Sequence, residues 1–268
     1  MRAFHDIIDP LDPRISAYCQ VREKDLVGRD GIFIAEGEVV VRRLAGSAEV
    51  EPVSLLLARK RLAGMADVID SLPAEAEIYV ADQEVMDTIV GFPIHRGILA
   101  IGRRKQIRDA ARLLADLPAQ ATVLAVCGIA NHDNMGGLFR NAAAFGVDAV
   151  LADHDCCDPL YRKAIRVSVG AALTMPFARL SSDEDMISVL TGAGFQPLAL
   201  SPQGEVRLVD LKASERRAVL MGAEGPGLPQ SYLERSKTVT IPMAHGFDSL
   251  NVATTGGIVL HHLRFAKV

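Results

Sequence analysis

Long apolar runs, paired cysteines and an excess of basic charge are all missing from this chain of 268 residues. No apolar run approaches the roughly 18 residues that a membrane-spanning helix needs, and acids and prolines stand where a signal peptide has an apolar stretch. The cysteines show no C-x-x-C spacing, which argues against a disulfide scaffold; they are Cys19, Cys127, Cys156 and Cys157. We therefore expect a cytoplasmic protein with no membrane partner.

Two further motif classes are absent. Neither G-x-G-x-x-G nor a Walker A sequence occurs, so nothing indicates a Rossmann-type dehydrogenase. The stretch from His154 to Asp158 contains two adjacent cysteines, but neighbouring side chains point in different directions and a tetrahedral zinc site needs spaced ligands. We expect no metal site.

The charge balance excludes a strongly basic nucleic-acid binder. The chain has 29 lysines and arginines against 33 acidic residues, a net charge of −4, and neither half is basic. Any RNA contact must come from local clusters. One is Arg103, Arg104 and Lys105 with Arg108, and the other is Arg162, Lys163 and Arg166. Charge alone favours a solvated surface for both clusters.

The order of apolar and polar segments predicts two α/β domains, and the 49% of apolar residues is enough for sizeable cores. Residues 1–105 form the first domain, with about 30 irregular residues at its start. Residues 106–119 form a linker helix that Pro118 ends. In residues 120–268, near-continuous apolar strands alternate with helices, which indicates a mostly parallel sheet covered on both faces. Ligands bind such sheets at the carboxyl ends of the strands.

The first unusual loop follows one of these strands and opens a helix. Asn134 stands where a helix N-cap is expected. Arg140 follows on an otherwise apolar helix and needs an anionic partner. The residues alone leave two alternatives open, which are a buried ion pair and a phosphate of a ligand.

Two more loops follow later strands. In one, Gly222, Gly225 and Gly227 surround Glu224 and free the backbone to approach a ligand closely, although a tight turn explains the spacing as well. The other, residues 241–253, leads into the last helix, where Ser249 or Asn251 would serve as a cap. Small residues, Gly256 and Gly257 among them, then allow close approach to a neighbouring element.

Together, and in this order, the three loops resemble the signature motifs of the SpoU (TrmH) family of RNA 2′-O-ribose methyltransferases, in the SPOUT class. The first family motif, N-x-x-N-x-G-x-x-x-R, is matched by Asn131, Asn134, Gly136 and Arg140. The second, G-x-E-G-x-G, is matched over 222–227, and the third over 241–253. Residues 158–171 resemble the family's connecting segment, and parts of the first domain resemble the ribosomal-protein-like substrate domain of longer members. His132 replaces the usual proline.

The resemblance implies a deep trefoil knot in the second domain, a homodimer and an rRNA or tRNA substrate. It also implies S-adenosylmethionine as cofactor, bound near Gly222, Ile241, Met243 and Leu250. Arg140 would act on the ribose 2′-hydroxyl and its phosphate, and the supporting residues would be Asn134, Glu224, Ser249 and Asn251. We expect Glu224 and Asn134 to orient Arg140 or elements of the second subunit.

Further RNA contacts follow from the same resemblance. The cluster of Arg162, Lys163 and Arg166 becomes a candidate RNA contact because phosphates dominate RNA affinity. The loop residues His132, Asp133 and His245 also lie in reach of RNA, although loop residues are more often merely solvated. The alternative function is a binding module of the same fold that methylates nothing.

Overall fold

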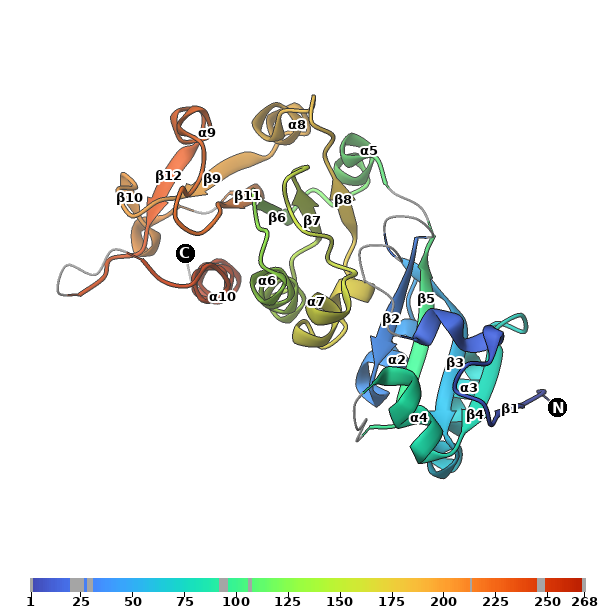
Figure 1. Cartoon of the computed structure of the whole chain (residues 1–268). Coiled ribbons are helices and arrows are strands. Elements are labelled where there is room, and N and C mark those ends of the chain that lie inside the picture. The colour runs from blue at the N-terminus through green and yellow to red at the C-terminus, as the bar shows by residue number, and fades with distance from the viewer. Residues whose placement is uncertain are drawn as a thin grey trace. The chain divides into compact units, whose positions relative to one another are not determined.

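The computed structural model describes residues 2–19, 27, 31–91, 96–105, 108–212, 214–244 and 249–266. Contacts divide the chain into two compact units, which are drawn in Figure 1. Unit 1 consists of Met1–Gln106 and Asp158–Thr174, and unit 2 consists of Ile107–Cys157 and Met175–Val268.

Unit 1 is built on a five-stranded sheet in the order β1-β4-β3-β5-β2. β1 pairs with β4 and β4 with β3 in parallel, whereas β5 runs antiparallel to both β3 and β2. The strands are β1 (His5–Ile7), β2 (Ile32–Glu36), β3 (Val50–Ala58), β4 (Glu77–Ala81) and β5 (Ile98–Arg104). The helices in the described part of the unit are η1 (Pro13–Tyr18), α2 (Glu38–Ala45), η3 (Arg59–Arg61), η4 (Ala63–Met65), α3 (Ala66–Ser71), α4 (Gln83–Val90), α7 (Arg162–Val167) and η5 (Ala171–Leu173).

Both faces of this sheet are buried. Because successive side chains of a strand point to opposite faces, Leu55 and Leu57 of β3 enter one core and Leu56 enters the other. Residues 158–174 also contribute to the first core through Ile165 and Leu173.

The boundaries of these units differ from the domains expected at 1–105 and 120–268. Residues 158–174 lie between β7 and β8 in the chain, yet they belong to unit 1, where Arg162 pairs with Glu36 (2.9 Å) and Asp158 with Arg104 (2.7 Å). The segment expected as a linker, 106–119, contains α5 (Ala110–Ala115), whose Leu113 and Leu114 are buried in the core of unit 2. Burial of apolar side chains explains both assignments.

Unit 2 is built on a seven-stranded sheet in the order β10-β12-β9-β11-β6-β7-β8, and every pairing in it is parallel. The strands are β6 (Ala121–Val126), β7 (Ala149–Ala152), β8 (Phe177–Arg179), β9 (Gln196–Leu200), β10 (Val206–Arg207), β11 (Arg216–Met221) and β12 (Lys237–Thr240). Its helices are α5, α6 (His132–Ala144), α8 (Met186–Gly192), η6 (Leu208–Asp210), α9 (Gln230–Glu234) and α10 (Val252–Phe265). The prediction of an α/β fold with a mostly parallel sheet is confirmed.

The central strands of unit 2 are apolar on both faces, as parallel strands between two helical layers must be. In β6, Val123 and Ala125 enter the core with α5 and α8, and Leu124 is buried as well. Helices α6 and α10 lie side by side (Figure 1) and cross closely, because an added Cβ at Gly137 would lie 2.7 Å from the Cβ of Ala253.

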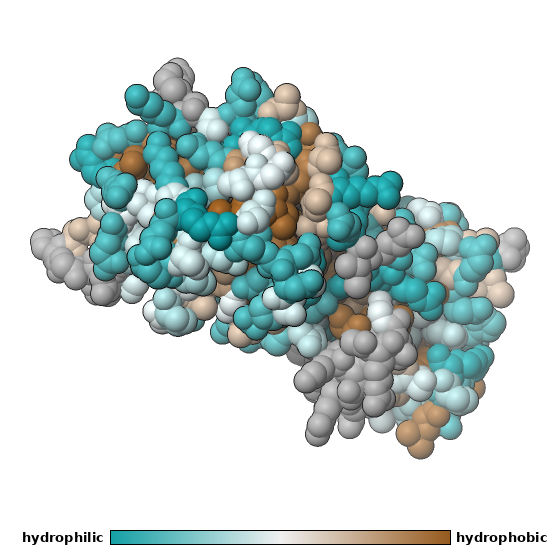
Figure 2. All heavy atoms as spheres, turned by 90° about the horizontal axis from the view of Figure 1, so that it is seen from above, coloured by the Kyte–Doolittle hydropathy of each residue, from teal (hydrophilic) through white to brown (hydrophobic). Residues whose placement is uncertain are grey.

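The face in Figure 2 is hydrophilic over most of its described surface, with hydrophobic residues in smaller areas between. Among the described residues, no helix is long and apolar enough to cross a membrane.

Candidate active site

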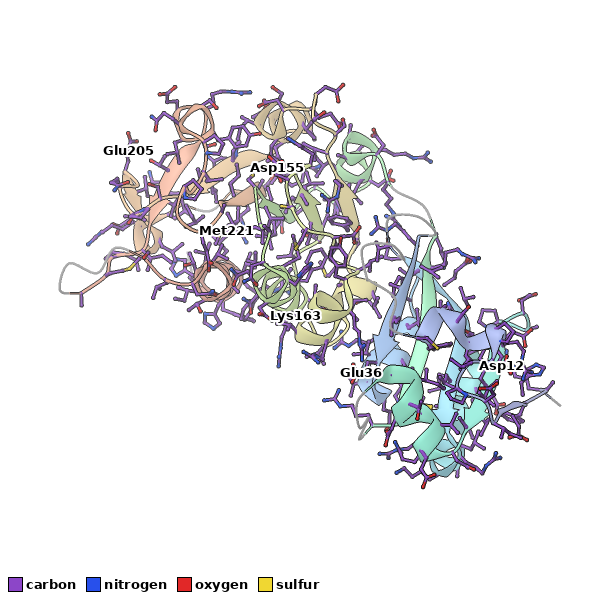
Figure 3. All side chains as sticks on the ribbon, viewed as in Figure 1. Asp12, Glu36, Asp155, Lys163, Glu205 and Met221 are labelled. Carbon is purple, nitrogen blue, oxygen red and sulfur yellow. The ribbon has the colours of Figure 1, made fainter. Side chains whose placement is uncertain are left out.

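The three unusual loops all begin at the carboxyl edge of the unit 2 sheet. β6 and β11 are neighbours in register, with Val126 opposite Met221, so the loops that follow them start side by side. The third loop follows β12, one strand beyond β9 in the same sheet. Met221, labelled in Figure 3, lies at this edge; its Cε would be 3.9 Å from a Cβ added at Gly256 of α10. This parallel geometry brings the three sequence motifs together.

Asn131, rather than Asn134, is the N-cap of α6. Its side-chain oxygen accepts hydrogen bonds from the backbone N–H groups of Asp133 (2.7 Å) and Asn134 (3.2 Å). The prediction that placed the cap at Asn134 is therefore wrong. Both asparagines are suitable cap residues, and the helix begins at the earlier one. Asn134 lies in the first turn and is buried, with its side chain directed to the second loop.

Asn134, Glu224 and Asn251 form a closed hydrogen-bonded triangle, one residue from each loop, which we call the amide–carboxylate triangle. Oε1 of Glu224 accepts from Nδ2 of Asn134 (2.8 Å) and from Nδ2 of Asn251 (3.2 Å). Nδ2 of Asn251 also donates to Oδ1 of Asn134 (2.8 Å). The triangle therefore fixes the three motif loops to one another.

Asn251 also caps α10. Its Oδ1 accepts hydrogen bonds from the backbone N–H groups of Ala253 (2.9 Å) and Thr254 (3.2 Å). One amide side chain thus ends the third loop, begins the last helix and joins the triangle. Ser249, the other candidate cap, is exposed and lies at the rim of the cavity described below.

Arg140 is exposed on α6 and is not part of the triangle. Within the described ranges, its guanidinium makes no hydrogen bond or ion pair, and the carboxylate of Glu224 bonds to Asn134 and Asn251 instead. Of the two alternatives left open by the sequence, a buried ion pair does not fit this exposure. An exposed arginine with no partner among the described residues has its donors available for the anion of a ligand.

A cavity of about 610 Å³ opens between the second and third loops and β9. It is lined by all four residues expected to hold the cofactor: Gly222, Ile241, Met243 and Leu250. Glu224, Ser249 and Asn251 also line it, whereas Arg140 does not. Of the loop residues expected near RNA, His245 lies outside the described part of the chain.

Gly222 is required by the shape of the second loop. A Cβ added there would lie 2.3 Å from the backbone carbon of Gly227 and 2.4 Å from the nitrogen of Leu228, so the loop folds back onto its own start. Gly227 itself has a positive φ of 71°, which favours glycine. The glycines therefore serve the tight turn and the cavity wall at once.

Sequence reasoning missed one wall of the cavity. Ser201, Pro202 and Gln203, which follow β9, line it beside the second loop. The rule that ligands bind at the carboxyl ends of parallel strands would have found them, because β9 lies between β11 and β12 in the sheet.

Asp153 and Arg179 hold the backbone beside the first loop through a set of hydrogen bonds that we call the carbonyl clamp. The carboxylate of Asp153, just after β7, accepts hydrogen bonds from the backbone N–H groups of Gly128 (2.9 Å) and Cys156 (3.1 Å). The guanidinium of Arg179 on β8 donates to the carbonyls of residues 153, 154, 156 and 157, at 2.7–3.3 Å. Since Gly128 leads into Asn131, the clamp fixes the start of α6.

The two cysteines of the 154–158 stretch lie in this clamp. Sγ of Cys156 is buried, donates to the carbonyl of Val126 (3.4 Å) and accepts from the N–H of Ile129 (3.3 Å). Burial, and secondarily the charge of Asp153, raises the pKa of the Cys156 thiol well above its usual range. No group of three or more His, Cys, Asp or Glu side chains suited to a metal ion occurs in the described part of the chain.

Both basic clusters include charges that pair within the protein. Arg103 pairs with Glu51, Arg104 with Asp158, and Lys105 donates to the carbonyl of Ala48. In the second cluster, Arg162 pairs with the largely buried Glu36, while Lys163 and Arg166 are exposed. Figure 3 labels Lys163 and Glu36.

The fold and the three motifs agree with comparisons to known proteins. The model of the SpoU rRNA methylase family matches residues 121–261. An "uncharacterized tRNA/rRNA methyltransferase" of Mycobacterium bovis is 38% identical and covers 96% of this chain and 90% of its own. The 23S rRNA (guanosine-2′-O-)-methyltransferase RlmB of Escherichia coli is 31% identical over 68% of this chain and 76% of its own.

Solved structures show the same fold. The AdoMet-bound rRNA methyltransferase of Sinorhizobium meliloti aligns with a TM-score of 0.82 at 23% identity, covering 97% of both chains. The methyltransferase AviRb of Streptomyces viridochromogenes aligns with a TM-score of 0.76 at 19% identity, covering 92% of this chain and 93% of its own. Because the family model matches residues 121–261 and the Mycobacterium bovis relative aligns over 96% of the chain, this chain belongs to the SpoU rRNA methylase family.

Proposed function

We propose that this chain uses S-adenosylmethionine to methylate the 2′-hydroxyl of a ribose in structured rRNA or tRNA. One observation carries the proposal: the amide–carboxylate triangle and a glycine-walled cavity are assembled from the three motif loops at one sheet edge, and Arg140, which makes no bond within the described ranges, is exposed on the helix that the first loop opens. RlmB, whose name describes 2′-O-methylation of a guanosine in 23S rRNA, supports the choice of the ribose oxygen.

The residues of the cavity suit S-adenosylmethionine. A volume of about 610 Å³ is in the usual range for a small-molecule site. Met221, Ile241 and Leu250 offer apolar surface to an adenine ring, and the glycine-rich loop exposes main-chain groups for hydrogen bonds. Bound there, the cofactor supplies a methyl group already activated on a sulfonium.

Arg140 would hold the RNA at the reacting oxygen. Since a guanidinium stays protonated in proteins, a neutral arginine acting as base is costly. The easier role is to bind the adjacent phosphate and stabilise the negative charge that develops on the 2′-oxygen. Asn134, Glu224 and Asn251 would act by holding the loops in register, and Ser249, exposed at the cavity rim, would contact the substrate.

Unit 1 would select the RNA. Arg162, Lys163 and Arg166 remain candidate phosphate contacts; Lys163 and Arg166 are exposed, and Arg162 also pairs with Glu36. We place the substrate-binding role in the ribosomal-protein-like part of unit 1, residues 1–105, together with these three basic side chains.

The proposal includes a homodimer. Val209, Ile258 and Phe265 are apolar and exposed, and Ile258 shares a largely apolar hollow with Val209, Phe145 and Pro242. A second copy would cover such a surface on α10 and η6. Sedimentation of the purified chain tests the dimer.

The proposal also includes a deep trefoil knot at the carboxyl end of the chain. β12 lies at the far side of β9, and the chain then returns so that α10 packs on α6 and Asn251 reaches both Asn134 and Glu224. This return path supports a knot formed by the third loop. An experimental backbone trace tests it.

The central test separates an enzyme from a silent RNA-binding module. Calorimetry should detect S-adenosylmethionine binding, and transfer of labelled methyl groups should occur on RNA from cells that lack this protein. Arg140→Ala should reduce transfer by about 10²-fold or more while leaving cofactor affinity unchanged.

Arg112→Ala is the matched control, because Arg112 is exposed on α5 and makes no side-chain bond within the described ranges. Cofactor binding without any methyl transfer would support the silent module instead. Full activity of Arg140→Ala would refute the assigned role.

A further inference from the structure

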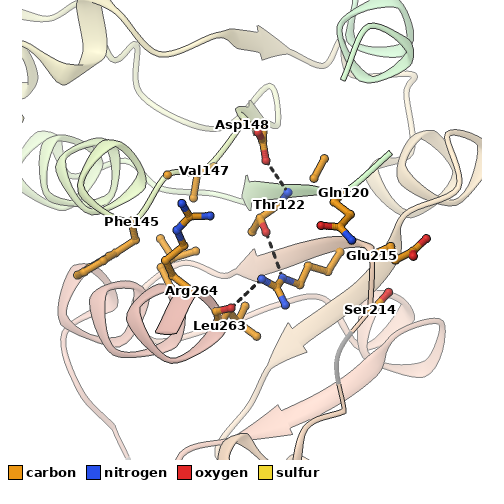
Figure 4. Close-up of a pocket in the computed structure, with 13 residues that line it drawn as sticks. Gln120, Thr122, Phe145, Val147, Asp148, Ser214, Glu215, Leu263 and Arg264 are labelled. Carbon is orange, nitrogen blue, oxygen red and sulfur yellow. Dashed lines mark hydrogen bonds between the residues drawn. The ribbon is translucent and has the colours of Figure 1, made fainter. Parts of the chain in front are cut away.

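A second cavity lies at the amino edge of the unit 2 sheet, away from the three motif loops. Its volume is about 360 Å³, and it is formed by the starts of β6 and β11, the turn between α6 and β7, and the end of α10. No residue that lines it also lines the cofactor cavity. Figure 4 shows its polar side chains, with Thr122, Asp148 and Arg264 among them.

Two arginines face this cavity with much of their donor capacity unused. Arg217 donates through Nε to Oγ1 of Thr122 (3.1 Å) and through Nη2 to the carbonyl of Leu263 (2.7 Å). Its Nη1 makes no bond to the described residues. Arg264, in the last turn of α10, is exposed and forms no hydrogen bond or ion pair with the described part of the chain. A guanidinium has five N–H donors, so both forks have donors for a ligand.

The carboxylates of the cavity do not neutralise these two charges. Oδ2 of Asp148 accepts from the backbone N–H of Thr122 (2.7 Å), and Glu215 lies at the opposite end of the cavity from Arg264 in Figure 4. Burial lowers the pKa of Arg217, the positive charge of Arg264 lowers it further, and Asp148 opposes this less strongly. The two guanidinium groups therefore repel each other.

The helix dipole of α10 explains only part of this arrangement. Cations are favoured at a helix C-terminus, and the bond from Arg217 to the Leu263 carbonyl satisfies one of the last carbonyls of α10. Arg264 makes no such bond among the described residues, and an ordinary capping role would not place a second like charge beside Arg217.

We propose that this cavity, which we call the amino-edge pocket, binds a phosphate group between Arg217 and Arg264. The planar forks of two arginines match the oxygen geometry of phosphate, and a bound anion would remove the repulsion between them. The phosphate belongs to a free nucleotide or to an RNA backbone. The proposal goes beyond methyl transfer and does not depend on it.

Calorimetry with three probes tests the pocket: inorganic phosphate, adenosine monophosphate and a short RNA oligonucleotide. Arg264→Gln removes one charge without removing any bond within the described protein, and it should weaken binding at least about tenfold. Arg264→Glu should abolish binding. Arg112→Gln, the same charge change at the exposed position on α5, should bind like the wild type. Melting temperatures of the three variants should not fall below that of the wild type, because neither substituted arginine makes a side-chain bond within the described protein.

The probes also identify the source of the phosphate. Binding of inorganic phosphate and the nucleotide that depends on Arg264 indicates a small-molecule site, and dependence seen with the oligonucleotide alone indicates a backbone contact. The affinity for S-adenosylmethionine should not change in Arg264→Gln, which separates this pocket from the cofactor cavity. The proposal is overturned if the wild type binds none of the three probes, or if Arg264→Gln binds them as tightly as Arg112→Gln.

Discussion

Removing the carboxylate of Glu224 should loosen all three motif loops at once. In Glu224→Ala, the buried Asn134 loses the acceptor of its Nδ2 group, and a buried donor without a partner costs about 1–3 kcal/mol. The amide of Asn251 is exposed and can bond to water, so it adds little. We expect the free energy of unfolding to fall by about 1–3 kcal/mol.

Glu224→Gln separates the shape of the side chain from its charge. A glutamine oxygen at the same position still accepts from both asparagines but loses the strengthening that a charged acceptor gives. We expect this variant to lose about 1 kcal/mol, the usual difference between charged and neutral hydrogen bonds. Urea unfolding followed by circular dichroism measures both variants, and a double-mutant cycle with Asn134→Ala measures the coupling.

Glu205→Ala is the matched control for this series. Glu205, labelled in Figure 3, is exposed, and its side chain makes no bond to the described residues. Its loss should change stability by less than about 0.5 kcal/mol. The reasoning is refuted if Glu224→Ala unfolds at the same urea concentration as Glu205→Ala, or if the effects of Glu224→Ala and Asn134→Ala simply add.

Three further predictions concern packing, positioning and pH. Gly137→Ala places a Cβ 2.7 Å from that of Ala253, and the forced separation of α6 and α10 should cost about 1–3 kcal/mol in a urea titration. Arg179→Lys keeps the charge but loses the planar guanidinium that bonds to four carbonyls. It should lower kcat for methyl transfer by a larger factor than it changes the KM for the cofactor. Asp185 caps α8 through Ser188 (2.8 Å) and bonds to Arg235, which lowers its pKa to about 2. Because that value lies below the unfolded value of about 3.9, its stabilisation is present above about pH 4 and lost toward about pH 2.

Each of these predictions has a contradicting result. If Gly137→Ala is as stable as the wild type, α6 and α10 can accommodate the added methyl group, which contradicts the prediction. If Arg179→Lys raises the KM for the cofactor and leaves kcat unchanged, Arg179 contributes to cofactor binding and not to positioning of the first loop. For Asp185→Ala, the stability deficit should stay below about 1 kcal/mol at neutral pH, since the pair is partly exposed, and shrink with acid. A deficit that persists at about pH 2 would exclude the charge as its cause.

The sequence predicted the parts of the fold that depend on local pattern. Apolar runs such as 123–126 and 218–221 are buried on both faces, so they indicated a parallel sheet. The carboxyl-end rule then located the loops, and the four residues expected at the cofactor all line one cavity. Gly256 and Gly257 likewise indicated a close helix approach, and an added Cβ at Gly256 would lie 2.7 Å from Leu138.

What failed depended on partners that are distant in the sequence. Asn131 and Asn134 have the same capping chemistry, and only Glu224, 90 residues later, shows which of them is engaged elsewhere. The ion pair of Arg162 with Glu36 was not predictable for the same reason, because Glu36 lies 126 residues before Arg162. No local pattern contains such information.

Electrostatics explains why it is useful that Arg140 and Glu224 do not form an ion pair. A carboxylate beside Arg140 would compete with an RNA phosphate for the same guanidinium, and displacing it would cost affinity. The triangle satisfies Glu224 with two amides instead, so the loops are fixed without using the cation. Among the described residues, Arg140, the charge that we propose for the substrate, is thus kept unpaired, while two neutral amides join the loops through Glu224. Stability and substrate affinity should therefore respond to different substitutions at this one site.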